Sequence, residues 1–215
     1  MTRPSIAYVD EQDDERANFY TDAYDSELFD EIHLVDPKPD LKDTLTELFD
    51  LGIDALVTDF NLTDAGPLGY SGEELVARFL AVREGFPCFI RTSYEEEALK
   101  TSADVNRVYS KDTKQTEHAG RPLFHRVALQ IERHRQQIRD WQEQMNALLN
   151  VAPEQRTAAD VEKIIDLDNK LETSVSADQR LSREAKESLF SKRHELNAET
   201  ERLIAEMKRA LGDDA

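Results

Sequence analysis

The chain has a single cysteine, Cys88, so an internal disulfide framework and a cysteine-based zinc cluster are both excluded. No apolar run approaches the roughly 20 residues that a membrane-spanning helix requires. The first residues lack the apolar stretch of a secretory signal peptide. From these absences we expect a cytoplasmic protein that does not associate with a membrane.

Positive charge is also scarce. The 215 residues include 27 Lys and Arg against 45 Asp and Glu, which gives a formal net charge of −18. Because proteins bind phosphate backbones through Lys and Arg patches, this balance argues against nucleic acid as a partner.

Glycine becomes rare in the second half, where Gly212 is the single glycine after Gly120. Charge divides the chain at the same place. Residues 1–120 hold 11 basic and 27 acidic residues, whereas residues 121–215 hold 16 and 18. The two stretches also differ in composition and pattern. Short apolar runs occur in the first, and Glu, Arg, Lys, Ala and Leu dominate the second. We therefore predict two domains, residues 1–120 and 121–215.

The first domain alternates short apolar runs with amphipathic segments. Apolar runs at 5–9, 32–35, 55–58, 88–90 and 107–109 predict strands, and residues 14–24, 41–51 and 72–83 have helical spacing between them. Strands that alternate with helices favour a parallel sheet covered on both faces. The prediction is an α/β fold with a five-stranded, doubly wound, flavodoxin-like sheet, followed by an all-α module.

Polar residues follow four of these runs. They are Asp10 and Glu11, Asp59, Thr92, and Lys111. In open parallel sheets, ligands bind beyond the carboxyl ends of the strands, so we expect these side chains to meet. Clustered carboxylates repel one another unless a cation lies among them, and their hard oxygens suit Mg²⁺. A carboxylate can also act as a nucleophile and form an aspartyl phosphate, and Asp59 is central in the set.

Five short segments in this order resemble the receiver domain of two-component response regulators over about residues 1–120. An acidic pair ends the first run, a phosphoacceptor strand ends in an aspartate, and a helix begins with glycine. A strand with a switch hydroxyl and a strand that ends in lysine complete the set. The segments are Val9-Asp10-Glu11, Leu56-Val57-Thr58-Asp59, Gly72-Glu73-Glu74-Leu75, Ile90-Arg91-Thr92-Ser93-Tyr94 and Tyr109-Ser110-Lys111.

The resemblance implies a role for each position. Asp10, Glu11 and Asp59 would hold Mg²⁺ together with the backbone carbonyl of Asn61. Asp59 would accept a phosphoryl group from a phosphohistidine of a histidine kinase or phosphotransfer protein. Thr92 and Lys111 would contact the new phosphate. Asn61 and Tyr94 occupy positions that tune dephosphorylation in the family. Such a protein is a phosphoacceptor switch rather than an enzyme with a separate substrate.

The sequence also departs from the family pattern. Glu11 replaces the usual aspartate, and the loop at residues 60–71 is several residues longer than is typical. Asp112 stands where the family has a proline that follows a cis peptide bond. The usual switch aromatic is replaced by Val108, and strand alternation sends the adjacent Tyr109 to the opposite face.

The second domain has helical periodicity. Apolar residues at steps of three and four predict a long helix over residues 122–150, which Pro153 ends. A capping-box pattern at Thr157 and Asp160 begins a helix over 157–174, and a further long helix is predicted over 177–211. We interpret this module as a homodimerisation or partner-binding device. A local basic stretch of four arginines is interpreted as a solvated helix face (Arg126, Arg133, Arg135 and Arg139).

Three other interpretations remain open. The first domain could be a degenerate, unphosphorylated receiver-like adaptor or scaffold. It could instead be an aspartate-based phosphatase, but the position two residues after Asp59 is Asn61, which cannot act as a general acid. Finally, His194-Glu195-Leu196-Asn197 faintly resembles the phosphorylated histidine box of histidine kinases.

Overall fold

A computed structural model describes residues 3–62, 68–102, 104–111 and 123–175. The chain divides into two compact units, Met1–Ile138 and Arg139–Ala215, and each is described by itself below. The helix predicted over 177–211, the histidine at 194 and the residue at 112 lie outside the described residues. No helix within the described part of the chain is long and apolar enough to cross a membrane.

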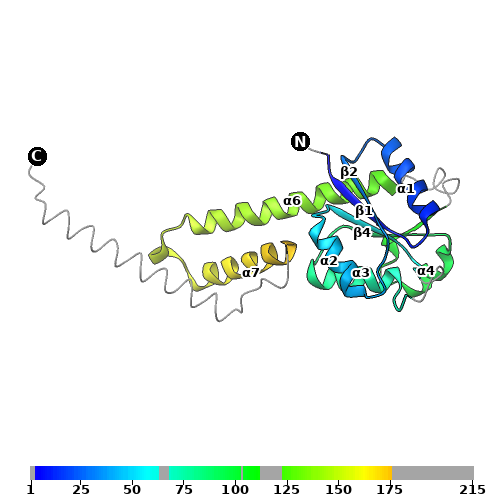
Figure 1. Cartoon of the computed structure of the whole chain (residues 1–215). Coiled ribbons are helices and arrows are strands. Elements are labelled where there is room, and N and C mark those ends of the chain that lie inside the picture. The colour runs from blue at the N-terminus through cyan, green and yellow to red at the C-terminus, as the bar shows by residue number, and fades with distance from the viewer. Residues whose placement is uncertain (1–2, 63–67, 103, 112–122, 176–215) are drawn as a thin grey trace, which may run out of the picture. The chain divides into compact units, whose positions relative to one another are not determined.

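A five-stranded parallel sheet forms the centre of the first unit (Figure 1). Its strand order is β2-β1-β3-β4-β5, which is the flavodoxin-like order of a doubly wound sheet. The predicted α/β fold is therefore confirmed. The strands are β1 (Ser5–Val9), β2 (Glu31–Val35), β3 (Ala55–Asp59), β4 (Cys88–Thr92) and β5 (Val108–Ser110).

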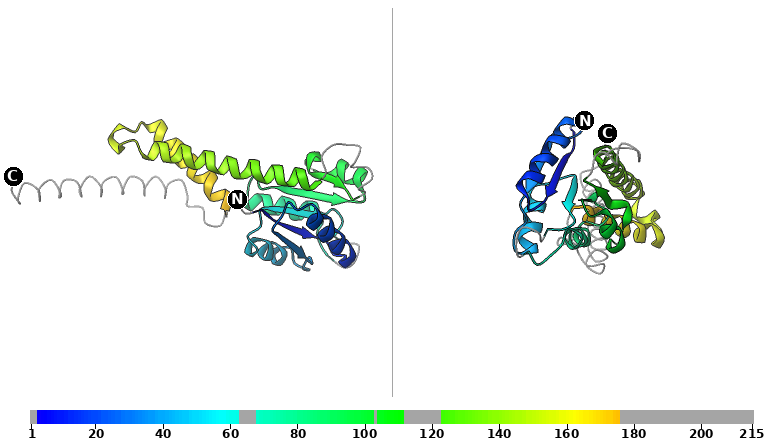
Figure 2. Two further views of the ribbon diagram at one scale, coloured as in Figure 1. Left: turned by 90° about the horizontal axis from the view of Figure 1, so that it is seen from above. Right: turned by 90° about the vertical axis from the view of Figure 1, so that its right-hand side faces the viewer.

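Helices cover both faces of this sheet (Figures 1 and 2). On one face, α1 (Asp13–Asp25) and the beginning of α6 (Leu123–Leu149) pack against Ile6, Tyr8, Val57 and Phe89. On the other face, α2 (Leu41–Asp50) and α3 (Gly72–Val82) pack against the alternate strand residues. The short helix α4 (Glu95–Thr101) and the 3₁₀ turn η1 (Val105–Arg107) connect β4 to β5.

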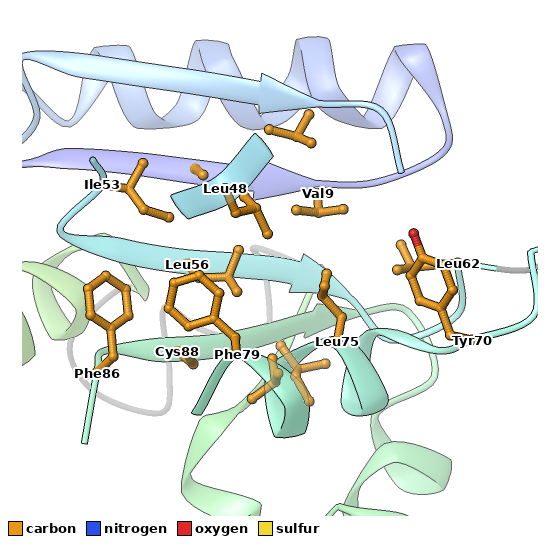
Figure 3. Packing of buried hydrophobic residues seen from close by; sticks show 14 residues of the cluster. Val9, Leu48, Ile53, Leu56, Leu62, Tyr70, Leu75, Phe79, Phe86 and Cys88 are labelled. Atoms are coloured by element: carbon orange, nitrogen blue, oxygen red, sulfur yellow. The ribbon is translucent and has the colours of Figure 1, made fainter. Parts of the chain in front are cut away.

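The core under α2 and α3 is continuous along the sheet, as Figure 3 shows. Leu48 from α2 and Leu75 and Phe79 from α3 are fully buried against Leu56 of β3. Burying a large apolar side chain of this kind contributes about 1.5–3 kcal/mol. Cys88 lies in the same cluster and is 3% exposed. Burial raises the pKa of its thiol to about 12, so the thiol stays protonated at neutral pH.

The first half of α6 belongs to the first unit. Leu123, Val127 and Ile131 repeat at helical spacing and are buried in the core that α1 shares. One turn further on, the guanidinium of Arg135 donates two hydrogen bonds to the carboxylate of Asp54 (3.2 and 2.8 Å). The boundary between the units therefore falls at Ile138–Arg139, inside α6, rather than at residue 120. The apolar stripe of α6 was predicted to belong to an independent helical module. Its first residues, Leu123, Val127 and Ile131, instead pack on the sheet beside α1.

The second unit contains the end of α6, the 3₁₀ turn η2 (Pro153–Gln155) and α7 (Ala158–Val175). The predicted capping box is present, because Asp160 accepts hydrogen bonds from the backbone N–H and hydroxyl of Thr157 (both 2.8 Å), and Thr157 Oγ1 accepts one from Asp160 N (3.2 Å). Arg156 donates to the carbonyls of Leu149 and Val151 at the end of α6 (2.6 and 3.0 Å). The helices α6 and α7 thus begin and end within one or two residues of the predicted ranges. Whether they pair with a second chain stays a prediction.

Candidate functional site

Four strands bring polar side chains to the same edge of the sheet. Asp10 follows β1, Asp59 ends β3, Thr92 ends β4 and Lys111 follows β5. The backbone N–H of Lys111 donates to the carbonyl of Thr92 (2.8 Å), which holds the end of β5 beside β4. Three of the predicted residues, Asp10, Asp59 and Lys111, are in direct contact.

The ammonium of Lys111 is the centre of this contact. Its Nζ lies 2.9 Å from Asp59 Oδ1 and 2.9 Å from Asp10 Oδ2, and it also pairs with Glu15 Oε2 on α1 at 3.3 Å. Burial alone would lower the pKa of the ammonium, but the hydrogen bonds and charges of Asp59 and Asp10 outweigh burial and raise it. Lys111 is therefore a fixed positive charge between two buried carboxylates.

Asp10 is fully buried, and both of its oxygens are hydrogen-bonded. Oδ2 accepts from the hydroxyl of Tyr8 (2.6 Å) as well as from Lys111, and Oδ1 accepts from the backbone N–H of Gln12 (2.9 Å). Tyr8 is itself fully buried, and its ring stacks on Phe19 of α1 at 4.1 Å. Burial and the adjacent carboxylate of Asp10 raise the pKa of the Tyr8 hydroxyl, so it remains a donor.

Asp59 is 5% exposed. Its Oδ2 accepts a hydrogen bond from the backbone N–H of Asn61 (2.8 Å), while Oδ1 faces Lys111. Burial raises the pKa of Asp59, although Lys111 and the Asn61 N–H act in the opposite direction. The carboxylate is thus oriented by one cation and one backbone donor at the edge of the sheet.

The backbone behind Asp59 is in close contact with the start of α3. A Cβ on Gly72 would lie 1.8 Å from the carbonyl oxygen of Asp59 and 3.0 Å from Thr58 Oγ1. The N–H of Gly72 donates to the carbonyl of Phe60 (3.0 Å), and Ser71 caps the helix by accepting from Glu74 N (3.2 Å). Only glycine fits at this position, which explains why the third helix begins with it.

Glu11 decides whether the site suits a divalent cation. Its Oε2 is buried and has no hydrogen-bond partner, while Oε1 accepts from Gln12 (3.2 Å). Burial is the main reason that its pKa is raised, and the charges of Asp10 and Asp59 also raise it. A buried carboxylate oxygen without a hydrogen-bond partner is the kind of hard donor that Mg²⁺ prefers. As positioned, however, no three acidic, histidine or cysteine side chains of the described residues are close enough together to hold a metal ion. Lys111 takes the cation's place between Asp10 and Asp59.

Thr92 lies at the edge of the sheet, and the two tyrosines considered with it, Tyr94 and Tyr109, point elsewhere. Thr92 is fully buried, and its Oγ1 accepts from the backbone N–H of Tyr94 (2.9 Å). Tyr94 itself is 54% exposed. Tyr109 lies on the α1–α6 face, where its ring packs against Phe89 at 5.8 Å, as strand alternation predicted.

Sequence reasoning missed Tyr8, Glu15 and Arg91. Tyr8 could have been found, because residues two apart on a strand share a face and Tyr8 is two residues before Asp10. Arg91 is 6% exposed and pairs with Asp22 of α1 at 2.9 Å, with its guanidinium over the Phe19 ring at 5.6 Å. Nothing in the sequence distinguishes this buried arginine from a surface one.

The end of the long β3–α3 loop is anchored outside the site. The hydroxyl of Tyr70 donates to the carbonyl of Lys38 (2.7 Å) and lies 2.8 Å from Thr44 Oγ1. Thr44 Oγ1 also accepts from Lys38 N (2.8 Å), so the β2–α2 connection and the loop share one hydrogen-bond network. Residues 63–67 of the loop lie outside the described residues.

The strand order and these strand ends together decide the fold. Acidic residues stand after β1 and at the end of β3, and a lysine after β5 contacts both. The first unit has a flavodoxin-like fold, and its strand ends carry the residues on which the resemblance to receiver domains was based.

Comparison with known proteins finds solved structures of low sequence identity and low structural similarity. No family model and no curated protein matches the chain. Two structures of the anti-anti-sigma factor PhyR from Bartonella quintana match at TM-scores of 0.43 and 0.41, with 12% and 13% identity over 61% and 60% of this chain. The chain spans about half of the PhyR chains (47% and 48%). The response regulator RcsB in a DNA complex matches at a TM-score of 0.42 and 12% identity, over 88% of this chain and 98% of that one.

Proposed function

We propose that this chain is a response regulator in which Asp59 accepts a phosphoryl group from a phosphohistidine. The observation that carries the proposal is the contact of Lys111 with both Asp59 and Asp10, at 2.9 Å each, at the carboxyl edge of the sheet. A structural ion pair needs one carboxylate. The lysine lies among three carboxylates, those of Asp59, Asp10 and Glu15, so the cluster keeps a net negative charge that a divalent cation would balance before a phosphoryl group is received.

The chemistry follows from the groups around Asp59. One carboxylate oxygen attacks phosphorus, the P–N bond of the phosphohistidine breaks, and its electron pair returns to the imidazole nitrogen, which takes up a proton. The product is an aspartyl phosphate. Lys111 pairs with the new phosphate oxygens, and the N–H of Asn61, which now donates to Asp59 Oδ2, remains available to them. Thr92 supplies a hydroxyl at the end of the next strand.

A divalent cation would complete the site. Asp10, Glu11, Asp59 and the backbone carbonyl of Asn61 are the groups that would hold Mg²⁺, which, when bound, draws negative charge from the phosphoryl oxygens. Asp10 Oδ2 is now occupied by Lys111 and Tyr8, so Lys111 has to release Asp10 before a cation can bind there. The protein's part is to keep the carboxylates buried and oriented.

The second unit is the output of the proposed switch. Phosphorylation would bias the first unit between two states and change how the C-terminal helices pair in a homodimer or bind a protein partner. Because α6 begins in the core of the first unit and ends in the second, it is the element that would transmit the change. If phosphorylation alters neither the oligomeric state nor the hydrogen exchange of α6 and α7, this coupling is wrong.

A second candidate has its own support. The absence of a metal-binding group among residues 3–62, 68–102, 104–111 and 123–175, together with glutamate at position 11, favours a receiver-like adaptor that is never phosphorylated. In that case Lys111 would serve to neutralise Asp10 and Asp59.

Intact-mass spectrometry after incubation with acetyl phosphate and Mg²⁺ separates the two candidates. The wild-type chain should gain one phosphoryl group, Asp59→Asn should gain none, and the exposed control Asp14→Asn should behave as wild type. A wild-type chain that gains no phosphoryl group and binds no Mg²⁺ by calorimetry would be the adaptor. An adduct that persists in Asp59→Asn would mean that another residue is the acceptor.

A further inference from the structure

A cavity of about 370 Å³ lies in the first unit, apart from the carboxylate site. It is bounded by the start of β4, by η1 and β5, and by the beginning of α6. Among the side chains that line it are Phe86, Arg107, Tyr109, Arg126, Gln130 and Arg133. Its volume is within the range of sites that bind small molecules.

Three arginines line this cavity in a chain with a net charge of −18. Arg16, Arg91 and Arg135, elsewhere in the first unit, each pair with an aspartate. Two of the cavity arginines do not. Among the described residues, Arg133 has no hydrogen bond or ion pair, and Arg126 has only a long contact with the Tyr109 hydroxyl (3.4 Å) besides its position over that ring.

The third arginine is only partly neutralised. Arg107 pairs with Asp104 at 3.2 Å, and both side chains are about one-third exposed (33% and 38%). An exposed pair of this kind contributes little and yields readily to a stronger ligand. The cavity thus has three guanidinium groups and one carboxylate, that of Asp104. The N–H donors of the guanidinium groups that are not bonded to Asp104 can form paired hydrogen bonds with a phosphate group.

The other walls of the cavity favour a planar group. Phe86 and Phe89 line it, and the Tyr109 ring is held between Phe89 (5.8 Å) and the guanidinium of Arg126 (5.5 Å). Gln130 on α6 adds an amide with both donor and acceptor atoms. The lining is therefore mixed, with three aromatic side chains beside three arginines, and it suits a ligand that has both a planar and a charged part.

We infer that this cavity binds a small phosphorylated molecule with a planar ring, of the nucleoside monophosphate class, with its phosphate held by Arg126 and Arg133. The cavity shares no residue with the carboxylate site, so the proposed ligand contacts involve neither Asp59 nor Lys111.

Isothermal titration calorimetry of the full chain tests this inference with three probes: AMP, inorganic phosphate and adenosine. AMP should saturate one site, and adenosine should bind at least about ten-fold more weakly, because hydrogen bonds to charged groups are worth roughly one to two factors of ten in affinity. Arg133→Gln and Arg126→Gln should each raise the Kd for AMP about ten-fold. The matched control is Arg78→Gln, an exposed residue on α3 that is remote in sequence from the cavity and makes the same change of charge.

Four results would overturn the inference. They are no saturation by AMP up to millimolar concentration, equal binding of adenosine and AMP, tighter binding of inorganic phosphate than of AMP, and an equal loss of affinity in Arg78→Gln. An acidic peptide that binds where AMP does not, and that requires Arg133, would make the cavity a protein-docking surface instead. Since all three variants alter exposed side chains, each should unfold at the wild-type temperature.

Discussion

Replacing Gly72 by alanine sets two physical effects of opposite sign against each other. By helix propensity alone, glycine costs up to about 1 kcal/mol relative to alanine, so the substitution would stabilise α3. The structure predicts the reverse, because the new Cβ would lie 1.8 Å from the carbonyl oxygen of Asp59 and 2.9 Å from its carbonyl carbon. Both neighbours are backbone atoms, so no side chain can rotate away. Overpacking of this kind costs about 1–3 kcal/mol or more, and we expect a net loss of stability in that range.

The assay is urea denaturation of the full chain, followed by near-ultraviolet circular dichroism of the buried tyrosines in the first unit. Gly69→Ala is the matched control, because a Cβ on Gly69 would have no atom within 4 Å and its φ is not positive. The control should change the free energy of unfolding by no more than about 0.5 kcal/mol. If Gly72→Ala is as stable as Gly69→Ala, the close contact between α3 and Asp59 is wrong. Because the clash acts on the backbone of Asp59, Gly72→Ala should also slow phosphoryl transfer from acetyl phosphate.

Three further predictions concern hydrogen bonds and charges described above. Tyr8→Phe removes a 2.6 Å hydrogen bond to the buried carboxylate of Asp10 and should cost about 1.5–3 kcal/mol of unfolding free energy. Burial raises the pKa of Asp59 above its ordinary value of 3.8, so the folded chain retains this proton to higher pH than the unfolded chain. The contribution of Asp59 to stability therefore falls as pH rises from about 4, and Asp59→Asn should remove that fall in a series of denaturation curves between about pH 4 and 7. Thr157→Ala removes its reciprocal hydrogen bonds with Asp160 and should destabilise α7 by about 1 kcal/mol.

Each of these has an internal control. Tyr24→Phe alters a hydroxyl on a side chain that is 66% exposed and should leave stability unchanged. Asp14→Asn should keep the wild-type pH dependence, since Asp14 is exposed. Trp141, the single tryptophan, contacts Lys170 of α7 at 5.9 Å, so its fluorescence reports on the second unit and should respond to Thr157→Ala. A response of the tyrosine signal alone would contradict the assignment of α7 to that unit.

The strands and most of the edge residues could be predicted because their pattern is local. A short apolar run followed by a carboxylate or a lysine marks the end of a buried parallel strand, and the strand order then brings these ends together. That reasoning correctly placed Asp59 and Lys111 at one edge. It could not predict that Lys111 would lie between Asp10 and Asp59, because that depends on how three buried charges balance after folding.

Two features of the structure could not be predicted from the sequence pattern alone. The extent of α6 in the first unit depends on which face of the sheet lacks cover, and α1 alone has few apolar residues to supply it. The apolar stripe of residues 123–138 therefore packs on the sheet, whereas periodicity alone cannot say which partner a stripe has. Similarly, the arginine at 91 is buried only because Asp22 and Phe19 reach it from α1, which is a contact across 69 residues.

The single cysteine, Cys88, allows the opening of the first unit to be measured by the rate of a chemical reaction. Cys88 lies at the start of β4 in the same core cluster as Phe79 and is 3% exposed, so an alkylating reagent should reach its thiol far more slowly in the folded chain than in the denatured chain. The labelling rate, compared with that of the denatured chain, therefore measures how often this unit opens without the introduction of any foreign probe. A phosphorylation-dependent or ligand-dependent change in the stability of the sheet would be read directly, at one atom, in the native sequence.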